Sequence, residues 1–164
     1  MRQRSKEQGL NKKKEDMQEN KTRVGVKKHT PDGGIHRPKM DGDIGSDLIV
    51  SKDTIIPASP CATATLIPSG VSIRIPSGYW CQIVGRSSAA NKRGLMVVGA
   101  TIDTGYLGEL MACVFNMTGK EMLVKKGEKI AQAIFYKTHV FDFEEVDKLE
   151  ATQRGESGYG STGR

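Results

Sequence analysis

Turn-forming residues interrupt this chain about every 8–12 residues from residue 41 onward, and this spacing limits what the chain can fold into. The runs between the turns are short and rich in β-branched residues, which favour an extended backbone. Helix is scarce, because only residues 88–92 offer a short candidate. The pattern predicts an all-β sandwich or barrel. The expected strands are 47–50, 54–57, 61–67, 71–75, 79–84, 97–102, 107–115, 122–124, 129–136 and 140–143.

Residues 97–111 have the pattern of a β-hairpin that places a carboxylate and an aromatic ring at one bend. The segment 103–105 supplies the turn, because Gly tolerates positive φ and an Asp side chain caps its own backbone. The bend leaves Asp103 and Tyr106 between two strands expected to be buried. Two interpretations remain open at this point. Asp103 is a turn former and Tyr106 a packing residue, or the two belong to a reactive site.

The positive charge is concentrated near the N-terminus. Residues 1–40 hold twelve Lys and Arg against five acidic residues, about +7, whereas the whole chain carries +6. This segment has no aromatic residue and little apolar surface, so we expect a basic, largely disordered arm. The arm is either a solvated tail or a segment that contacts nucleic acid or an acidic partner. A β-domain over 41–150 and a flexible Gly-rich arm over 151–164 complete the expected organisation.

Three cysteines, Cys61, Cys81 and Cys113, lack metal-binding spacing. Because the cysteines are few and odd in number, we expect no disulfide framework, and the set suits a reducing compartment. No apolar run approaches the roughly 18 residues of a membrane helix, so no membrane partner is expected. No apolar segment follows Met1, so no secretory signal is expected either.

Two further stretches have the composition of phosphate-binding segments. Residues 85–88 (GRSS) follow a strand and are expected to begin a helix, whose first turn presents spare N–H donors to an anion. The tail 154–163 combines an arginine, a tyrosine and two hydroxyls on a Gly-rich backbone, which can wrap phosphate and stack on a base. The alternatives are an ordinary helix start with a surface arginine, and a low-complexity chain end.

Five stretches then follow one another in a fixed order: 45–48 (GSDL), 85–88 (GRSS), 99–109 (GATIDTGYLGE), 126–132 (KGEKIAQ) and 154–163 (RGESGYGSTG). Together they resemble the five motifs of the trimeric dUTP pyrophosphatase (dUTPase) family, over residues 41–164. The sequence around 78–80 (GYW) and the tail are most similar to retroviral and other viral or microbial members. In the fourth motif Glu128 and Lys129 stand where Asp and Arg are usual, which keeps both charges.

The resemblance implies a jelly-roll-like β-barrel that forms a homotrimer with active sites shared between chains. It implies cleavage of dUTP to dUMP and diphosphate with Mg²⁺, in a cellular or viral protein of the cytoplasm or nucleus. Asp103 would be the general base, Asp47 would hold Mg²⁺ through water, and Tyr106 would exclude a 2′-hydroxyl. The implied substrate-binding residues are Ala100, Thr101, Ile102 and Met111 for uracil; Arg86, Ser87, Ser88 and Gln132 for phosphate; and Arg154, Tyr159, Gly160, Ser161 and Thr162 in the closing arm.

Two other functions are alternatives to this one. A dCTP deaminase shares the implied fold, but its catalytic Glu is expected where this chain has Cys113. A regulatory or nucleic-acid-binding protein would use the basic arm instead of the site. If the arm lies outside the enzyme, removing residues 1–36 is expected to leave activity.

Overall fold

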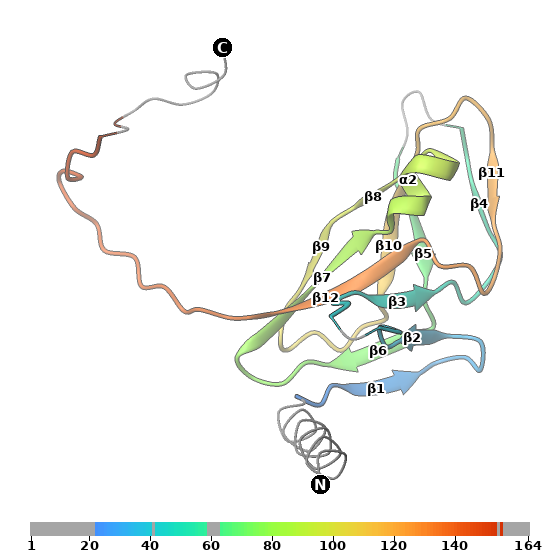
Figure 1. Cartoon of the computed structure of the whole chain (residues 1–164), viewed down its shortest axis with the longest axis horizontal. Coiled ribbons are helices and arrows are strands. Elements are labelled where there is room, and N and C mark those ends of the chain that lie inside the picture. The colour runs from blue at the N-terminus through green and yellow to red at the C-terminus, as the bar shows by residue number, and fades with distance from the viewer. Residues whose placement is uncertain (1–21, 41, 59–62, 154, 156–164) are drawn as a thin grey trace, which may run out of the picture.

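The computed structural model of the chain describes residues 22–40, 42–58, 63–153 and 155. These residues form short strands and one helix, which confirms the all-β prediction (Figure 1). The expected helix is present as α2, Ser87–Arg93. The strands are β1 (Gly25–Lys28), β2 (Gly34–His36), β3 (Ser46–Ile49), β4 (Thr54–Ile56), β5 (Thr65–Pro68), β6 (Val71–Arg74), β7 (Tyr79–Gly85), β8 (Leu95–Val98), β9 (Ala100–Ile102), β10 (Met111–Asn116), β11 (Met122–Val124) and β12 (Ala131–Lys137).

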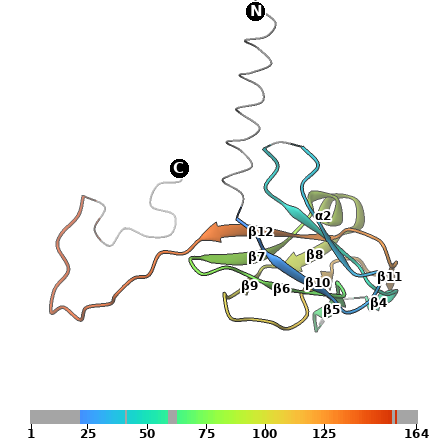
Figure 2. The ribbon, with the colours of Figure 1, turned by 90° about the horizontal axis from the view of Figure 1, so that it is seen from below.

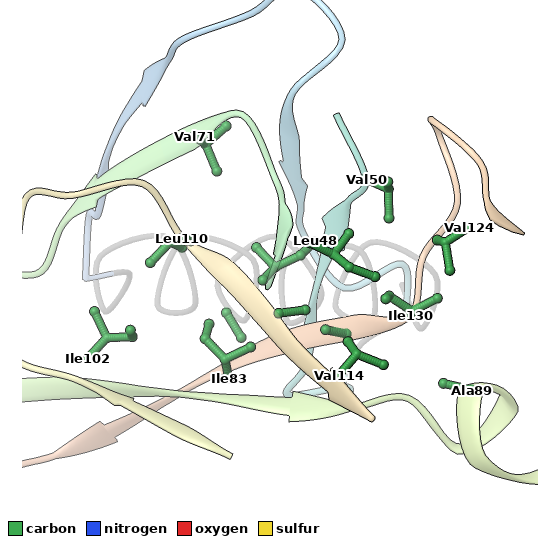
Figure 3. Packing of buried hydrophobic residues seen from close by; sticks show 14 of the residues in the cluster. Leu48, Val50, Val71, Ile83, Ala89, Ile102, Leu110, Val114, Val124 and Ile130 are labelled. Atoms are coloured by element: carbon green, nitrogen blue, oxygen red, sulfur yellow. The ribbon is translucent and has the colours of Figure 1, made fainter. Parts of the chain in front are cut away.

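The strands pair into four antiparallel sheets. The largest has the order β2-β3-β12-β7-β9, a second has the order β5-β10-β8, and β1-β6 and β11-β4 form pairs. The buried residues of these sheets make one apolar core, in which Leu48 and Ile83 from the largest sheet lie near Leu110 and Val114 (Figure 3). The fold therefore holds β3, β12 and β7 side by side, and these three strands carry most of the candidate site.

The hairpin expected over 97–111 is only partly correct. β8 does pair with β10: Leu95 lies opposite Asn116, and Val98 lies opposite Cys113. At Gly99 the chain then leaves β10, and β9 pairs with β7 in the other sheet. The expected strand 107–115 begins only at Met111, because residues 103–110 form the connection between the two sheets. A local pattern of β-branched residues does not reveal such a change of partner.

The barrel begins earlier than residue 41. Within the expected arm 1–40, β1 pairs with β6 and β2 pairs with β3. The turn between them packs tightly on the next turn of the barrel, since a Cβ on Gly33 would lie 2.5 Å from the carbonyl oxygen of Gly70. β1 is exposed along its whole length, which explains why its composition resembles a tail. Residues 1–21 lie outside the described residues.

Two smaller expectations also fail. No strand forms at 140–143; residues 138–153 instead run away from the body of the molecule (Figure 2). The alternation of apolar and polar residues over 71–75 predicts one buried and one exposed face, but in β6 Ser72 is buried, and its hydroxyl lies 2.7 Å from Nε2 of His29. No helix among the described residues has the length and apolar character that crossing a bilayer requires.

Candidate active site

A charged cluster lies at one end of the largest sheet. Asp47 on β3 lies directly opposite Gln132 on β12, and Arg86 follows the last residue of β7. The Asp47 carboxylate makes two ion pairs, with Oδ1 3.2 Å from Nε of Arg86 and Oδ2 3.3 Å from Nζ of Lys129. Residues of three of the five motifs therefore meet within one chain.

The backbone fixes the position of Arg86. Its N–H donates to the carbonyl of Ile130 at 2.9 Å, which ties the end of β7 to the start of β12. Helix α2 begins at the next residue, with Ser87 exposed and Ser88 half-buried, and no side chain caps its first turn. Gly94 ends the helix with φ of +61°, a conformation that favours glycine.

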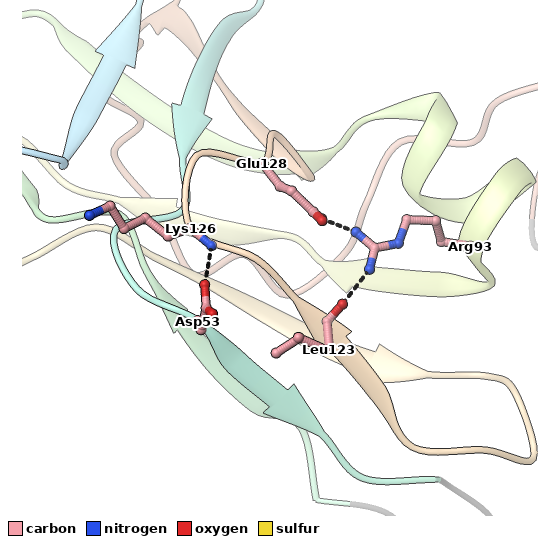
Figure 4. Close-up of polar contacts among 5 residues, drawn as sticks. All are labelled: Asp53, Arg93, Leu123, Lys126 and Glu128. Carbon is pink, nitrogen blue, oxygen red and sulfur yellow. Dashed lines mark hydrogen bonds and ion pairs between the residues drawn. The ribbon is translucent and has the colours of Figure 1, made fainter.

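Helix α2 is also anchored at its other end. The guanidinium of Arg93 pairs with the carboxylate of Glu128 and donates a second bond to the carbonyl of Leu123 at 2.8 Å (Figure 4). The neighbouring backbone N–H of Lys126 donates to Asp53 at 2.7 Å. Because Glu128 precedes Lys129, these bonds hold the loop that presents Lys129 to Asp47.

Gln132 depends on a glycine. A Cβ on Gly45 would lie 2.0 Å from the amide oxygen of Gln132, so the side chain of Gln132 lies across the space that this glycine leaves open. The sequence alone did not assign that role to Gly45. The signal was present in the first motif, but it requires knowing that β3 and β12 are neighbours.

The cluster lines a pocket with a volume of about 1050 Å³. Asp47, Arg86, Lys129 and Gln132 form one side, and residues 35–40 and 43–45 contribute the rest together with Ile134. Sequence reasoning missed Lys129 as a site residue and missed residues 35–40 altogether, because it placed the latter in the arm.

Asp103 lies far from this pocket in the same chain. It follows β9, whose last residue, Ile102, pairs with Cys81 near the start of β7, whereas Arg86 follows the end of β7. The length of β7 therefore separates the two, about 20 Å at 3.3 Å per residue. The turn after Asp103 is held by its own carbonyl, which accepts from the N–H of Tyr106 at 3.1 Å, and by Thr104, whose hydroxyl donates to the carbonyl of Tyr79 at 2.6 Å.

Tyr106 is partly exposed beside this turn, and its hydroxyl donates to the carbonyl of Glu109 at 3.2 Å. Its ring occupies the space that Gly108 leaves open, since a Cβ there would lie 2.3 Å from the Tyr106 hydroxyl. Asp103 itself is exposed and makes no ion pair with any of the described residues. Its carboxylate is therefore accessible to a ligand.

The strand that ends next to Asp103 has a free backbone edge, and this edge together with that of Met111 on β10 is called the backbone slot. β9 is the outermost strand of its sheet, so one edge of Ala100, Thr101 and Ile102 has no partner strand among the described residues. β10 pairs with β8 only from Cys113 onward, so the edge of Met111 on the β8 side has no partner strand in the part of the chain that the structure describes. Both edges thus present backbone N–H and C=O groups where the two strands diverge. Arg154, Tyr159, Gly160, Ser161 and Thr162 lie outside the described residues.

A family model described as dUTPase matches residues 32–163 of this chain. The chain belongs to the dUTPase family. Among its relatives, the deoxyuridine 5′-triphosphate nucleotidohydrolase of Paramecium bursaria Chlorella virus 1 is 38% identical over 123 residues, which cover 75% of this chain and 85% of the relative. The corresponding protein of Rhodococcus erythropolis is 36% identical over 143 residues, 85% of each chain.

Solved structures of dUTPases share the fold of this family member. A Staphylococcus bacteriophage 80alpha dUTPase variant with dUpNHpp superposes with a TM-score of 0.77 at 22% identity, covering 88% of this chain and all of that one. The dUTPase of phage phi11 of S. aureus, in a structure that describes coordination of a structural Mg(II) ion, gives 0.71 at 18% identity, covering 79% of this chain and all of that one. At these identities the likeness establishes the jelly-roll dUTPase fold.

Proposed function

We propose that this dUTPase family member cleaves dUTP to dUMP and diphosphate, with Asp103 as the general base. The observation that carries the assignment is the backbone slot between β9 and β10, which ends at the exposed carboxylate of Asp103. A base held in the slot would place the rest of a nucleotide beside that carboxylate. Asp103 would then take a proton from the water that attacks the α-phosphorus, and the bond from that phosphorus to the leaving diphosphate would break.

The slot supports recognition of uracil. Backbone N–H and C=O groups of Ala100, Ile102 and Met111 can pair with the donor and acceptor edge of one pyrimidine. Cytosine reverses part of that pattern and would leave buried polar groups unpaired, at about 1–3 kcal/mol each. Tyr106 lies in the turn that follows Asp103, and its ring would contact the deoxyribose and leave no space for a 2′-hydroxyl.

The charged pocket suits the phosphate chain. Arg86 and Gln132 would contact phosphate oxygens, with Ser87 and Ser88 at the start of α2 beside them. When bound, magnesium neutralises charge on the triphosphate. The ion commonly keeps several water ligands and is held by one or two carboxylates together with phosphate oxygens. Asp47 fits that requirement as a carboxylate in the pocket. Both its oxygens already face cations, so contact through a water is the arrangement we propose.

A separation of about 20 Å within one chain supports a site that is completed by a second chain. If Asp103 and the slot come from one subunit and the Asp47 pocket from another, a symmetric trimer completes each site. The outer face of β5-β10-β8 supports assembly: Cys113 lies opposite both Leu66 and Val98, and Phe115 lies opposite Met96. Leu66, Met96 and Val98 are exposed in the single chain, and an apolar face of this kind marks a protein contact.

The segment after β12 supports the same assembly. Val140, Phe141 and Phe143 are between 73% and 97% exposed, and Leu149 is 82% exposed. Exposure of several large apolar side chains to water is unfavourable. We therefore propose that residues 138–153 lie on a neighbouring subunit. That placement would carry the fifth motif, with Arg154, Tyr159, Gly160, Ser161 and Thr162, to the substrate. A reducing compartment, cytoplasm or nucleus, is consistent with this proposal.

The alternatives receive no specific support. The position at which a deaminase would need its Glu is occupied by Cys113, whose side chain lies on the outer apolar face and not in the slot. The arm proposed for a nucleic-acid-binding or acidic-partner function lies mainly in residues 1–21, outside the described residues.

The test is release of diphosphate from dUTP, dCTP and UTP by the full chain. We expect turnover of dUTP alone and a fall in kcat of about 10²–10⁴-fold in Asp103→Asn, with binding of the non-hydrolysable analogue dUpNHpp retained. Asp53→Asn is the matched control, because that carboxylate bonds only the Lys126 N–H among the described contacts. Full turnover by Asp103→Asn would refute the assignment of the base, and equal use of dCTP would refute the reading of the slot.

A further inference from the structure

Residues 37–40 and 43–45, which lie in the loop between β2 and β3, form the second wall of the charged pocket. β2 and β3 pair with His36 directly opposite Asp47, so the loop leaves the sheet beside the carboxylate. Across the sheet the order is β2, β3, β12, β7, which places Asp47 between this loop on one side and Lys129 and Arg86 on the other. Arg86 and Lys129 thus belong to one side of the pocket, and the loop forms the other side.

The loop side is also basic. Arg37 and Lys39 both line the pocket and are exposed, and neither is in an ion pair within the part of the chain that the structure describes. On the opposite side, Arg86 and Lys129 share the single charge of Asp47. With Asp43 as the other acidic residue among the described lining, four basic side chains face two acidic ones. The pocket therefore has an excess of positive charge that a polyanion would neutralise.

Pro38 stands between the two loop cations and is half-buried in the same wall. Its ring fixes φ near −65°, so the backbone that carries Arg37 and Lys39 has less freedom to lose on binding than an ordinary loop. Cations that only make the surface soluble would need no restriction of the backbone between them. They would also have no reason to line the same pocket wall. The geometry favours a binding surface over a solubilising one.

We propose that Arg37 and Lys39 bind the β- and γ-phosphates of the nucleotide, and hence the leaving diphosphate, from the side of the pocket opposite Arg86. This proposal rests on the proposed function, because it takes the Asp47 pocket to be the phosphate end of the site. The two side chains supply charge-assisted hydrogen bonds to phosphate oxygens. They neutralise charge that accumulates on the leaving group as the bond to the α-phosphorus breaks.

The experiment compares two double variants of the full chain that lose the same charge. Arg37→Gln with Lys39→Gln removes the loop cations. Arg23→Gln with Lys27→Gln removes one exposed Arg just before β1 and one exposed Lys on β1, neither of which lines the pocket. Binding of inorganic diphosphate and of dUMP is measured by calorimetry, and KM and kcat for dUTP by diphosphate release.

We expect the loop variant to bind diphosphate about tenfold more weakly and to show a raised KM for dUTP, while its affinity for dUMP stays within twofold. The β1 variant should match the unmodified chain. Equal diphosphate affinity in the two variants, or an equal loss in both, would overturn the proposal. Failure of the proposed function would be seen separately, as absence of dUTP turnover by the unmodified chain, whatever the loop variant does to diphosphate binding.

Discussion

Asp47 and Arg86 are joined at 3.2 Å from Oδ1 to Nε, and Lys129 occupies the other carboxylate oxygen at 3.3 Å. The three residues come from β3, from the residue after β7 and from the residues before β12, which no local sequence pattern connects. Their side chains are between 21% and 35% exposed, so solvent screens the pairs and their contribution to stability is small. The arrangement holds two cations in position around one acid.

Asp47→Asn should therefore impair function more than folding. Without the carboxylate charge, Arg86 and Lys129 repel each other and the water-mediated contact to Mg²⁺ weakens. We expect the Mg²⁺ concentration for half-maximal turnover to rise at least severalfold, with the melting temperature within about 4 °C of the unmodified chain. Initial rates across a Mg²⁺ titration provide the measurement. Asp43→Asn, in the same pocket but outside the ion-pair cluster, is the control, and an equal shift in both variants would contradict the assignment.

Gly45→Ala tests the positioning of Gln132. The new Cβ would meet the amide of Gln132, whose flexible side chain can move away at little cost in stability. We expect kcat/KM for dUTP to fall about tenfold while the melting temperature changes little. Gly119→Ala is the control, because a Cβ there meets nothing within 4 Å. If Gly45 acts through Gln132, the loss in Gly45→Ala and the loss in Gln132→Ala will not add in the double variant.

The sequence was sufficient to predict the class of fold. The regular turns specify short strands, and Asp47, Arg86 and Gln132 do meet in the structure. It was not sufficient to predict strand partners, because register depends on residues far away in the chain. The change of partner at Gly99 is one example.

The N-terminal boundary is the other example. β1 pairs with one strand only and is exposed on both faces, so its composition carries no apolar signal. The error had a functional consequence, since it removed residues 35–40 from consideration as part of the pocket. The separation of Asp103 from Arg86 within one chain does not follow from local patterns either, although it is compatible with the shared active sites that the resemblance implies.

The deletion expected from sequence to be harmless should in fact be damaging. Removing residues 1–36 takes away β1, β2 and the contact of Gly33 with Gly70. We expect that variant to aggregate or unfold at 37 °C, whereas removal of residues 1–21 leaves every described strand in place and should retain dUTP turnover. Thermal unfolding and solution mass of the two truncations provide the comparison. A stable, active variant lacking 1–36 would show that β1 and β2 are dispensable.

Gly33→Ala tests the contact between Gly33 and Gly70 by adding one methyl group. Its Cβ would lie 2.5 to 2.7 Å from the backbone of Gly70, which cannot move aside as a side chain can. Overpacking of this kind typically costs about 1–3 kcal/mol. Urea unfolding should show that loss, and Gly119→Ala should not. An unchanged midpoint in Gly33→Ala would mean that the two turns are not packed as the structure has them.

Cys81 should make the stability of the protein fall at high pH. The side chain is fully buried, and burial raises the pKa of the Cys81 thiol from its ordinary 9.0 to about 11, with a backbone hydrogen bond at Ile134 offsetting part of the rise. Above pH 9 the unfolded chain therefore loses this proton while the folded chain keeps it. The associated stability is complete below pH 9 and is lost as the pH rises toward 11, up to about 3 kcal/mol.

The measurement is urea unfolding between pH 8 and 11 for the unmodified chain, Cys81→Ala and Cys113→Ala. The unmodified chain and Cys81→Ala differ only in the Cys81 side chain, so the difference between their unfolding free energies isolates the buried thiol. That difference should shrink steadily above pH 9, because only the unmodified chain has the Cys81 proton to lose. Cys113→Ala should follow the pH dependence of the unmodified chain. A constant difference between the unmodified chain and Cys81→Ala would show that the thiol ionises alike in the folded and unfolded states, and so that the core around Ile83 and Ile102 admits water.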